Sequence, residues 1–321
     1  MVKQRDISID ILKFIAALLI TNSHMEILYG KYSVLATGGA IGDVLFFFAS
    51  GFTLFLGSEK RFDNWYKRRI NRIYPTVFAW AIMGAFFFNH HDDMKYVIIH
   101  GGGWFVTCIM IYYIIFYLIR WLMKDKLKLI FVIAGLIVII WYFVINPPFG
   151  FNIYGDTYFK WGHYFLFMLL GATMGISKQD INCSFFNIIF KLMSCLIVYY
   201  GMLALCRKVE QLQHLELLSL VPLLFITYYV YKLCNTKEIK RLYYNKYAGM
   251  VIKFVGGLCL EIYLVQYSLF TDKMNDLFPL NLLLMMIIII VVAYILRCMA
   301  RIFIQTFRTE DYCWKDVFKL Y

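Results

Sequence analysis

Three ionisable side chains, Asp10, Lys13 and His24, lie in one apolar stretch near the start of the chain. A helix turns about 100° per residue, so His24 returns to within about 20° of Lys13, and Asp10 lies about 40° from His24 on the same side. The three are therefore expected to form one stripe along a helix. Charges inside a bilayer are costly and usually mark a function, and an imidazole there can take up or release a proton.

Plainer interpretations of this stripe stay open. Asp10 and Lys13 can reach the inner membrane interface and pair with each other. That pairing leaves His24 unexplained, because His24 lies about 16 Å farther along the helix axis than Lys13. A structural bond from His24 to a neighbouring helix would also satisfy its imidazole.

A strongly basic segment, SEKRFDNWYKRRINRIYP, occupies positions 58–75. Arg69 and Arg72 are three residues apart, so they can share one helical face, with Arg68 next to them. Guanidinium forks at this spacing suit a group that carries several phosphates. The plainer alternative is a cytoplasmic loop that sets the topology, with Pro75 opening the next membrane span.

Weaker signals lie elsewhere in the chain. Glu261, in LEIYLVQ, is a second costly charge inside an apolar run. Asp43 lies early in another run, where Ser50 and Gly51 would permit close helix packing. The outer segment from His90 to His100 holds three histidines and two aspartates. We interpret it as a solvated loop, and no metal site is expected.

The composition indicates which elements must position these residues. The chain has 321 residues, of which 62% are hydrophobic and only 16% charged, and its mean hydropathy is +0.67. A soluble globule could not bury so much apolar surface, which excludes an ordinary cytosolic enzyme and a disordered chain. The absence of any CxxC pair argues against a disulfide scaffold or a zinc site. The expected fold is all-α, a polytopic transmembrane helix bundle formed by a single domain over 1–321.

Ten apolar stretches have about the length needed to cross a bilayer. They are 8–28, 40–57, 75–90, 104–123, 129–145, 159–176, 185–206, 217–234, 251–271 and 281–307. With the N-terminus inside, 24 Lys and Arg fall in inner segments and six in outer segments. This bias predicts that both ends are cytoplasmic, and it accounts for the net charge of +12 without a nucleic-acid partner. The expected location is the cell inner (plasma) membrane.

In order along the chain, these elements resemble the membrane acyltransferase 3 family. That family typically carries Asp-x-x-Arg and then a histidine near the end of the first helix, matched here by Asp10, Lys13 and His24, with Lys in place of Arg. GDVLFFFASGF at 42–52 looks like its second-helix GxxFFxxSGF element.

Three later elements extend the resemblance over nearly the whole chain. KRRINRIYP is similar to the family's RRxxRxxP element through Arg68, Arg69, Arg72 and Pro75, and Trp104-Phe105 is similar to its Trp-Phe element. LEIYLVQ is similar to the late (S/L)xxIYLxH element, with Gln266 where His is common. No appended hydrolase-like domain is present, so the stand-alone form is expected.

The resemblance implies transfer of an acyl group, usually acetyl, from cytoplasmic acyl-CoA to a hydroxyl of a sugar, polysaccharide or lipid-linked glycan. His24 is expected to be the general base, with Asp10 or Glu261 orienting neighbouring groups such as Lys13. Arg68, Arg69 and Arg72 are expected to hold the CoA phosphates. The partners are then acyl-CoA, a glycan acceptor and the lipid bilayer, while a homodimer and an acyl-histidine relay stay open.

Two alternatives from other classes use the same residues. In a transporter or flippase, His24, Asp10 and Glu261 would form a proton relay, and the basic segment would set topology only. In a non-catalytic sensor or partner subunit, His24 would be structural and replaceable.

Overall fold

The structure, a computed structural model, describes residues 6–56, 61–145, 150–155, 157–177 and 184–320. Its described part is all-helical and holds no strand, which confirms the predicted class. Lys3, Arg5, Lys60 and Lys178, four of the residues assigned to the inner side, lie outside these ranges.

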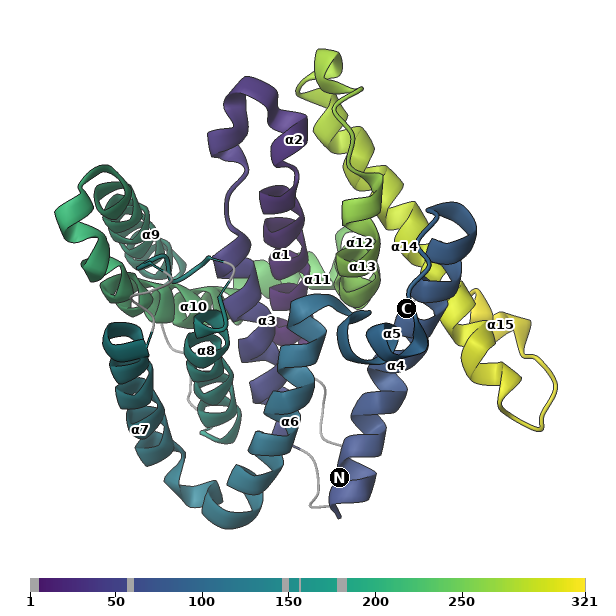
Figure 1. The fold of residues 1–321 in the computed structure, drawn as a ribbon, viewed down its shortest axis with the longest axis horizontal. Coiled ribbons are helices and arrows are strands. Elements are labelled where there is room, and N and C mark those ends of the chain that lie inside the picture. The colour runs from purple at the N-terminus through teal and green to yellow at the C-terminus, as the bar shows by residue number, and fades with distance from the viewer. Residues whose placement is uncertain (1–5, 57–60, 146–149, 156, 178–183, 321) are drawn as a thin grey trace. The chain divides into compact units, whose positions relative to one another are not determined.

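The α-helices and the shorter helical turns (η) follow one another along the chain (Figure 1). They are α1 (Ile7–His24), α2 (Glu26–Tyr29), η1 (Gly30–Leu35), α3 (Gly39–Leu54), α4 (Phe62–Phe87), α5 (Met94–His100), α6 (Gly103–Met123), η2 (Lys124–Lys126), α7 (Leu127–Ile140), η3 (Trp141–Ile145), α8 (Phe159–Ile176), α9 (Phe185–Lys208), η5 (Glu210–Ser219), α10 (Leu220–Cys234), α11 (Lys237–Tyr244), α12 (Lys246–Gly257), α13 (Cys259–Leu269), η6 (Asn275–Leu277), α14 (Leu280–Thr306) and α15 (Trp314–Val317).

Each of the ten predicted stretches contains helix, but fewer qualify as spans by length and apolar character. Five stretches do so in the described residues: Ile7–His24, Gly103–Ile145, Phe185–Lys208, Glu210–Cys234 and Leu280–Thr306. Two bent pairs, Glu26–Leu35 with Gly39–Leu54 and Lys246–Gly257 with Cys259–Leu269, raise the number to seven. Gly103–Ile145 is 43 residues long and contains two of the predicted spans. The total of ten spans therefore stays a prediction.

From Phe62 onward, the basic segment is helical rather than a loop. α4 runs unbroken from Phe62 to Phe87 with Pro75 inside it, so the helix begins 13 residues before the predicted opening at Pro75. Proline lacks an N–H, so the carbonyl of Asn71 loses its usual donor. The rest of the helix tolerates this one missing bond.

The chain divides into two compact units. Unit 1 comprises 1–16, 40–58 and 119–250, and unit 2 comprises 17–39, 59–118 and 251–321. Four of the boundaries fall inside α1, α3, α6 and α12, so these helices contribute residues to both units.

In unit 1, glycines let α3 and α8 approach each other closely. A Cβ added to Gly51 would overlap the carbonyl oxygen of Met168, and one added to Gly171 would overlap that of Phe48. No side chain fits at such a crossing, which confirms the close packing predicted at Gly51. Elsewhere in this unit α7 packs on α8, and α9 on α10 (Figure 1).

In unit 2, α14 packs against both α4 and α13. The rings of Phe78 on α4 and Phe303 on α14 lie 5.8 Å apart. α13 also carries Glu261 and Gln266, and both side chains are buried. This packing therefore places the two polar side chains inside the unit.

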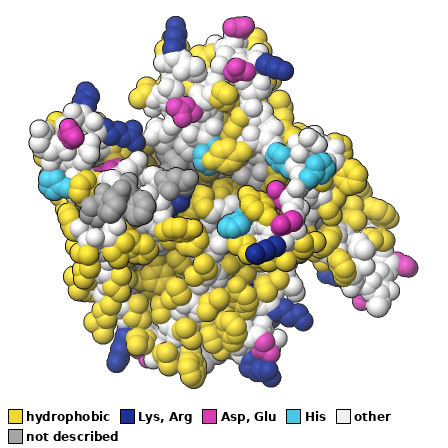
Figure 2. Space-filling view, in the orientation of Figure 1, with side chains coloured by type: hydrophobic (Ala, Val, Ile, Leu, Met, Phe, Trp, Pro, Cys, Tyr) yellow, Lys and Arg dark blue, Asp and Glu magenta, His cyan; other side chains and the backbone are white. Residues whose placement is uncertain are grey.

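Much of the apolar surface faces outward, as a lipid environment requires. On α7 the side chains of Leu129, Val132, Leu136 and Ile140 are each about half exposed, and this helix contributes to the yellow surface at the lower left of Figure 2. Exposed apolar patches larger than a few hundred Å² are rare on soluble monomers, so this face indicates contact with lipid.

The predicted orientation can be tested at exposed positions. In a background without native cysteines, single cysteines at Asn64 and Asp125 should be protected from an impermeant reagent in intact cells. Cysteines at Lys95 and Asp276 should be labelled. Efficient outside labelling at position 64 would contradict the orientation and remove the basic face of α4 from the cytoplasm.

Candidate active site

His24 is the last residue of α1, and it contacts α13 through two neighbouring side chains. Its Nδ1 lies 2.9 Å from the amide Nε2 of Gln266. Its ring centroid lies 4.6 Å from that of Tyr267. Gln266 is fully buried, whereas His24 is half-buried. A bond to a neighbouring helix fits the plainer structural interpretation of His24, and it also leaves the second ring nitrogen, Nε2, available for chemistry.

The end of α1 is anchored by the residues that follow it. The Asn22 amide donates to the carbonyls of Leu35, at 3.1 Å, and Thr37, at 2.9 Å. The hydroxyl of Tyr29 donates to the Asn22 amide oxygen at 2.5 Å. These bonds fold the segment after His24 back along α1 and hold the helix end that carries the imidazole.

The GGGWF turn contacts the same helix, α13, as His24 does. Gly103 has φ of 66°, and a Cβ there would lie 2.7 Å from the hydroxyl of Tyr263. The rings of Phe105 and Tyr263 lie 5.8 Å apart. Glycine is needed for both the backbone conformation and the close approach. The turn therefore fixes α13 from a second direction.

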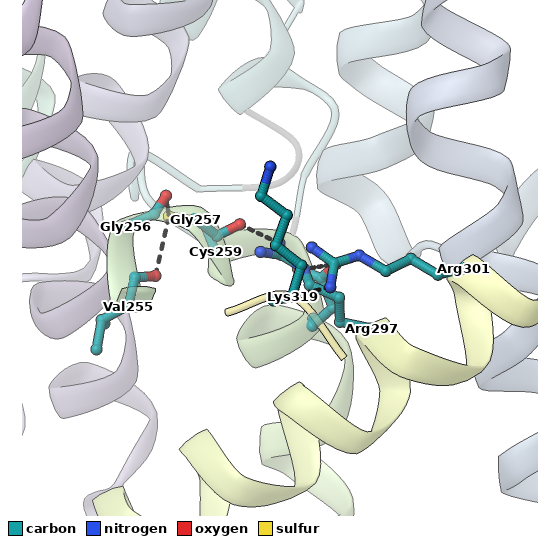
Figure 3. Close-up of polar contacts among 8 residues, drawn as sticks. Val255, Gly256, Gly257, Cys259, Arg297, Arg301 and Lys319 are labelled. Carbon is teal, nitrogen blue, oxygen red and sulfur yellow. Dashed lines mark hydrogen bonds and ion pairs between the residues drawn. The ribbon is translucent and has the colours of Figure 1, made fainter. Parts of the chain in front are cut away.

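The predicted span 251–271 is broken into α12 and α13, which are bent by 73°. The break frees carbonyls that need new donors in an apolar environment. Arg297 on α14 donates to the carbonyl of Gly257 (Figure 3). The Cys259 thiol lies 3.0 Å from the carbonyl oxygen of Gly256 and 3.8 Å from that of Val255. These contacts replace helix bonds at the break.

The same arginine holds Glu261 in a two-point ion pair. Arg297 Nε and Nη2 lie 3.0 and 2.8 Å from the two carboxylate oxygens. The side chains are only 15% and 6% exposed. Such forked pairs fix geometry as well as charge. In the sequence, Arg297 counts only among the inner basic residues. Like Glu261, however, Arg297 is a charged residue inside an apolar run, and this position alone could have marked it as a candidate site residue.

Asp10 and Lys13 lie on the same unbroken helix as His24, but belong to unit 1. Asp10 is buried and accepts a hydrogen bond from the Tyr243 hydroxyl at 3.1 Å. Lys13 is half-buried. Nothing in the sequence pointed to Tyr243, which lies on α11, more than two hundred residues away.

The three arginines of α4 differ in their surroundings. The Arg69 guanidinium lies 3.8 Å from the Trp65 ring centroid and 5.7 Å from that of Tyr113, and it donates to the Trp65 carbonyl at 2.9 Å. Arg68 and Arg72 are exposed and, four residues apart, share one face of α4. Arg69 is therefore pre-positioned by aromatic rings, whereas Arg68 and Arg72 reach outward.

A second polar cluster, in unit 1, joins α3 to α8. The Tyr164 hydroxyl donates to Asp43 at 3.2 Å, and the ring of His163 lies 4.3 Å from that of Tyr164. His163 is fully buried, with Nε2 3.0 Å from the carbonyl oxygen of Ile153. This cluster holds two helices of unit 1 together, whereas the residues that contact His24 belong to unit 2.

The segment from His90 to His100, which is predicted to face outward, also carries a structural carboxylate. Asp93 caps α5 by accepting a hydrogen bond from the Tyr96 N–H at 2.6 Å. Side chains at this position satisfy N–H groups that a helix start leaves open. The Asp93 carboxylate therefore has a structural role as the N-cap of α5.

A family model described as an acyltransferase domain matches residues 6–298, nearly the whole chain. No curated protein and no solved structure matches significantly. The matched range contains all the candidate residues, from Asp10 to Arg297.

Proposed function

Because the chain belongs to the acyltransferase 3 family, we propose that it is a membrane O-acyltransferase that uses cytoplasmic acyl-CoA to acylate a hydroxyl of a sugar, polysaccharide or lipid-linked glycan. The acyl group in this proposal is acetyl, and the donor is its CoA thioester. The proposal places the protein in the cell inner membrane, with its acceptor on a glycan.

The observation that carries the proposal is the placement of His24. Its imidazole lies at the end of an apolar helix, with Nδ1 engaged by Gln266 at 2.9 Å and Nε2 left for a substrate. A general base must be neutral and within hydrogen-bond reach of the hydroxyl that it deprotonates. In the proposed step, Nε2 takes the acceptor hydroxyl's proton while the oxygen attacks the thioester carbonyl. The C–S bond then breaks, and the imidazolium returns the proton to the CoA thiolate.

The other charged residues would act through their neighbours. Glu261 is committed to Arg297, and Asp10 accepts from Tyr243, so both are proposed as positioning groups. Lys13 lies one turn after Asp10 on α1, where it is proposed to balance the charge of that carboxylate.

The basic face of α4 is proposed to hold the CoA phosphates. Arg68 and Arg72 share an exposed face, and Arg69 is oriented by its contacts with Trp65 and Tyr113. Guanidinium groups bind phosphate oxygens through paired N–H donors, which a lysine cannot reproduce.

Removing Arg72 should weaken donor binding without changing the chemistry. If Arg72 grips a phosphate equally in the ground and transition states, Arg72→Ala should raise KM for acyl-CoA about 10–100-fold and leave kcat nearly unchanged. Arg72→Lys should restore part of the loss. The measurement is steady-state kinetics on purified protein.

Lys67→Ala is the matched control, since Lys67 is an exposed cation on the same helix but on another face. Its KM should change little. A fall in kcat at constant KM for Arg72→Ala would remove the proposed phosphate site.

The proposal as a whole is tested with purified protein, acetyl-CoA labelled in the acetyl group, and candidate glycans. Transfer of the label to a glycan with release of free CoA is expected. Label retained covalently on His24 would instead support an acyl-histidine relay. Solute exchange without consumption of acetyl-CoA would overturn the enzyme proposal in favour of a transporter.

A further inference from the structure

The buried amide of Gln266 is bonded at one end only. One end faces Nδ1 of His24 at 2.9 Å, while the other end, Oε1, is buried and has no hydrogen-bond partner among the described residues. Buried polar atoms without a partner are rare in native proteins. The side chain is fully buried, so bulk water does not satisfy this end.

The free end leaves the amide able to turn. With Nε2 of Gln266 facing the ring, Nδ1 of His24 must accept, and the ring proton sits on the His24 Nε2 atom. A half-turn puts Oε1 in the same place, and Nδ1–H then donates to it. No partner in the described part of the chain holds the far end against this half-turn.

Only the second arrangement supports a base. It leaves a lone pair on the His24 Nε2 atom, which can take the proton of a hydroxyl. The imidazolium that follows keeps its Nδ1–H donor bonded to oxygen, whereas it would face another N–H donor in the first arrangement. In serine hydrolases an acceptor at this ring position fixes the productive tautomer in the same manner.

We propose that Gln266 is a positioning residue that holds His24 in the Nδ1–H tautomer through its amide oxygen. This inference rests on the proposed role of His24 as the base. Because an unpartnered histidine prefers the Nε2–H tautomer, the Nδ1–H form requires such an acceptor. A neutral amide provides it without the charge that a carboxylate would add.

Nitrogen NMR of ring-labelled histidine measures the tautomer without any need for turnover. The His24 signal is identified by its loss in His24→Ala. Native protein should show His24 as the Nδ1–H tautomer, and Gln266→Leu should shift it toward Nε2–H. An Nε2–H signal in the native protein would overturn the inference even if the enzyme is active. The inference about Gln266 can therefore fail while the proposed function holds.

Kinetics provide the second measurement. Gln266→Leu should lower kcat about 2–10-fold, the value of one neutral hydrogen bond, at unchanged KM. Gln266→Glu keeps an acceptor oxygen and adds a negative charge, so the variant should stay active. Because a nearby carboxylate favours the imidazolium, the acid limb of its pH–rate profile should move to a pH about one to three units higher. A purely structural role predicts less folded protein but an unmoved profile, and that result would overturn the inference.

Discussion

His24→Ala is expected to abolish acyl transfer while leaving the protein inserted in the membrane and able to bind acyl-CoA. The alanine variant loses the proposed proton acceptor, and removal of a general base typically costs about 10²–10⁴-fold in rate. Because the proposed phosphate-binding arginines lie on α4, donor binding should persist. The measurement is turnover at saturating substrate, together with acyl-CoA binding to the same preparation.

His90→Ala is the matched control, because His90 is an exposed histidine between α4 and α5 in the same unit. Its turnover should equal that of the native protein. Near-normal turnover of His24→Ala would remove its catalytic role and leave the bond to Gln266 as a structural contact.

Arg297→Met should be strongly destabilising. It leaves the Glu261 carboxylate, only 6% exposed, without its two charged hydrogen bonds. Removing one partner of a buried ion pair typically costs about 3–5 kcal/mol, because the remaining charge is uncompensated. The Gly257 carbonyl at the break also loses its donor. The expected result is a large fall in Tm in detergent, with little folded protein recovered.

The double variant Glu261→Gln with Arg297→Met supplies the control. Removing both charges removes the uncompensated one, so it should recover much of the stability lost in Arg297→Met. Its activity then reports whether Glu261 does more than pair with Arg297. Equal stability of the single and double variants would show that the pair does not hold the break together.

The positions of the helices could be predicted because apolar runs of about 20 residues are a strong local signal. The start of α4 could not be predicted. Proline is common in the first turn of a helix, so Pro75 was expected to begin the helix, and the basic residues before it were compatible with a loop. The break after Gly257 was also missed, since α12 and α13 together form one apolar run. The contacts from Arg297 and Cys259 that satisfy the carbonyls at this break depend on side-chain packing, which hydropathy does not record.

The sequence could indicate individual residues of the candidate site but not the contacts between them. His24 and Glu261 are visible because each is polar within an apolar run. Their partners are not, since the Gln266 and Arg297 contacts depend on how distant helices pack. Gln266 is notable in the sequence only as a departure from the usual histidine, yet its amide lies within hydrogen-bond distance of the His24 ring.

The separation of these two residues along the chain has a consequence for how the protein is made. His24 and Gln266 are 242 residues apart, so a ribosome adding about 5–20 residues per second needs about 12–48 s to supply the second after the first. During that interval the imidazole lies in the nascent first helix without its eventual partner. A chain that stops before α13 would lack Gln266, so the contact with His24 can form only after most of the protein has been made.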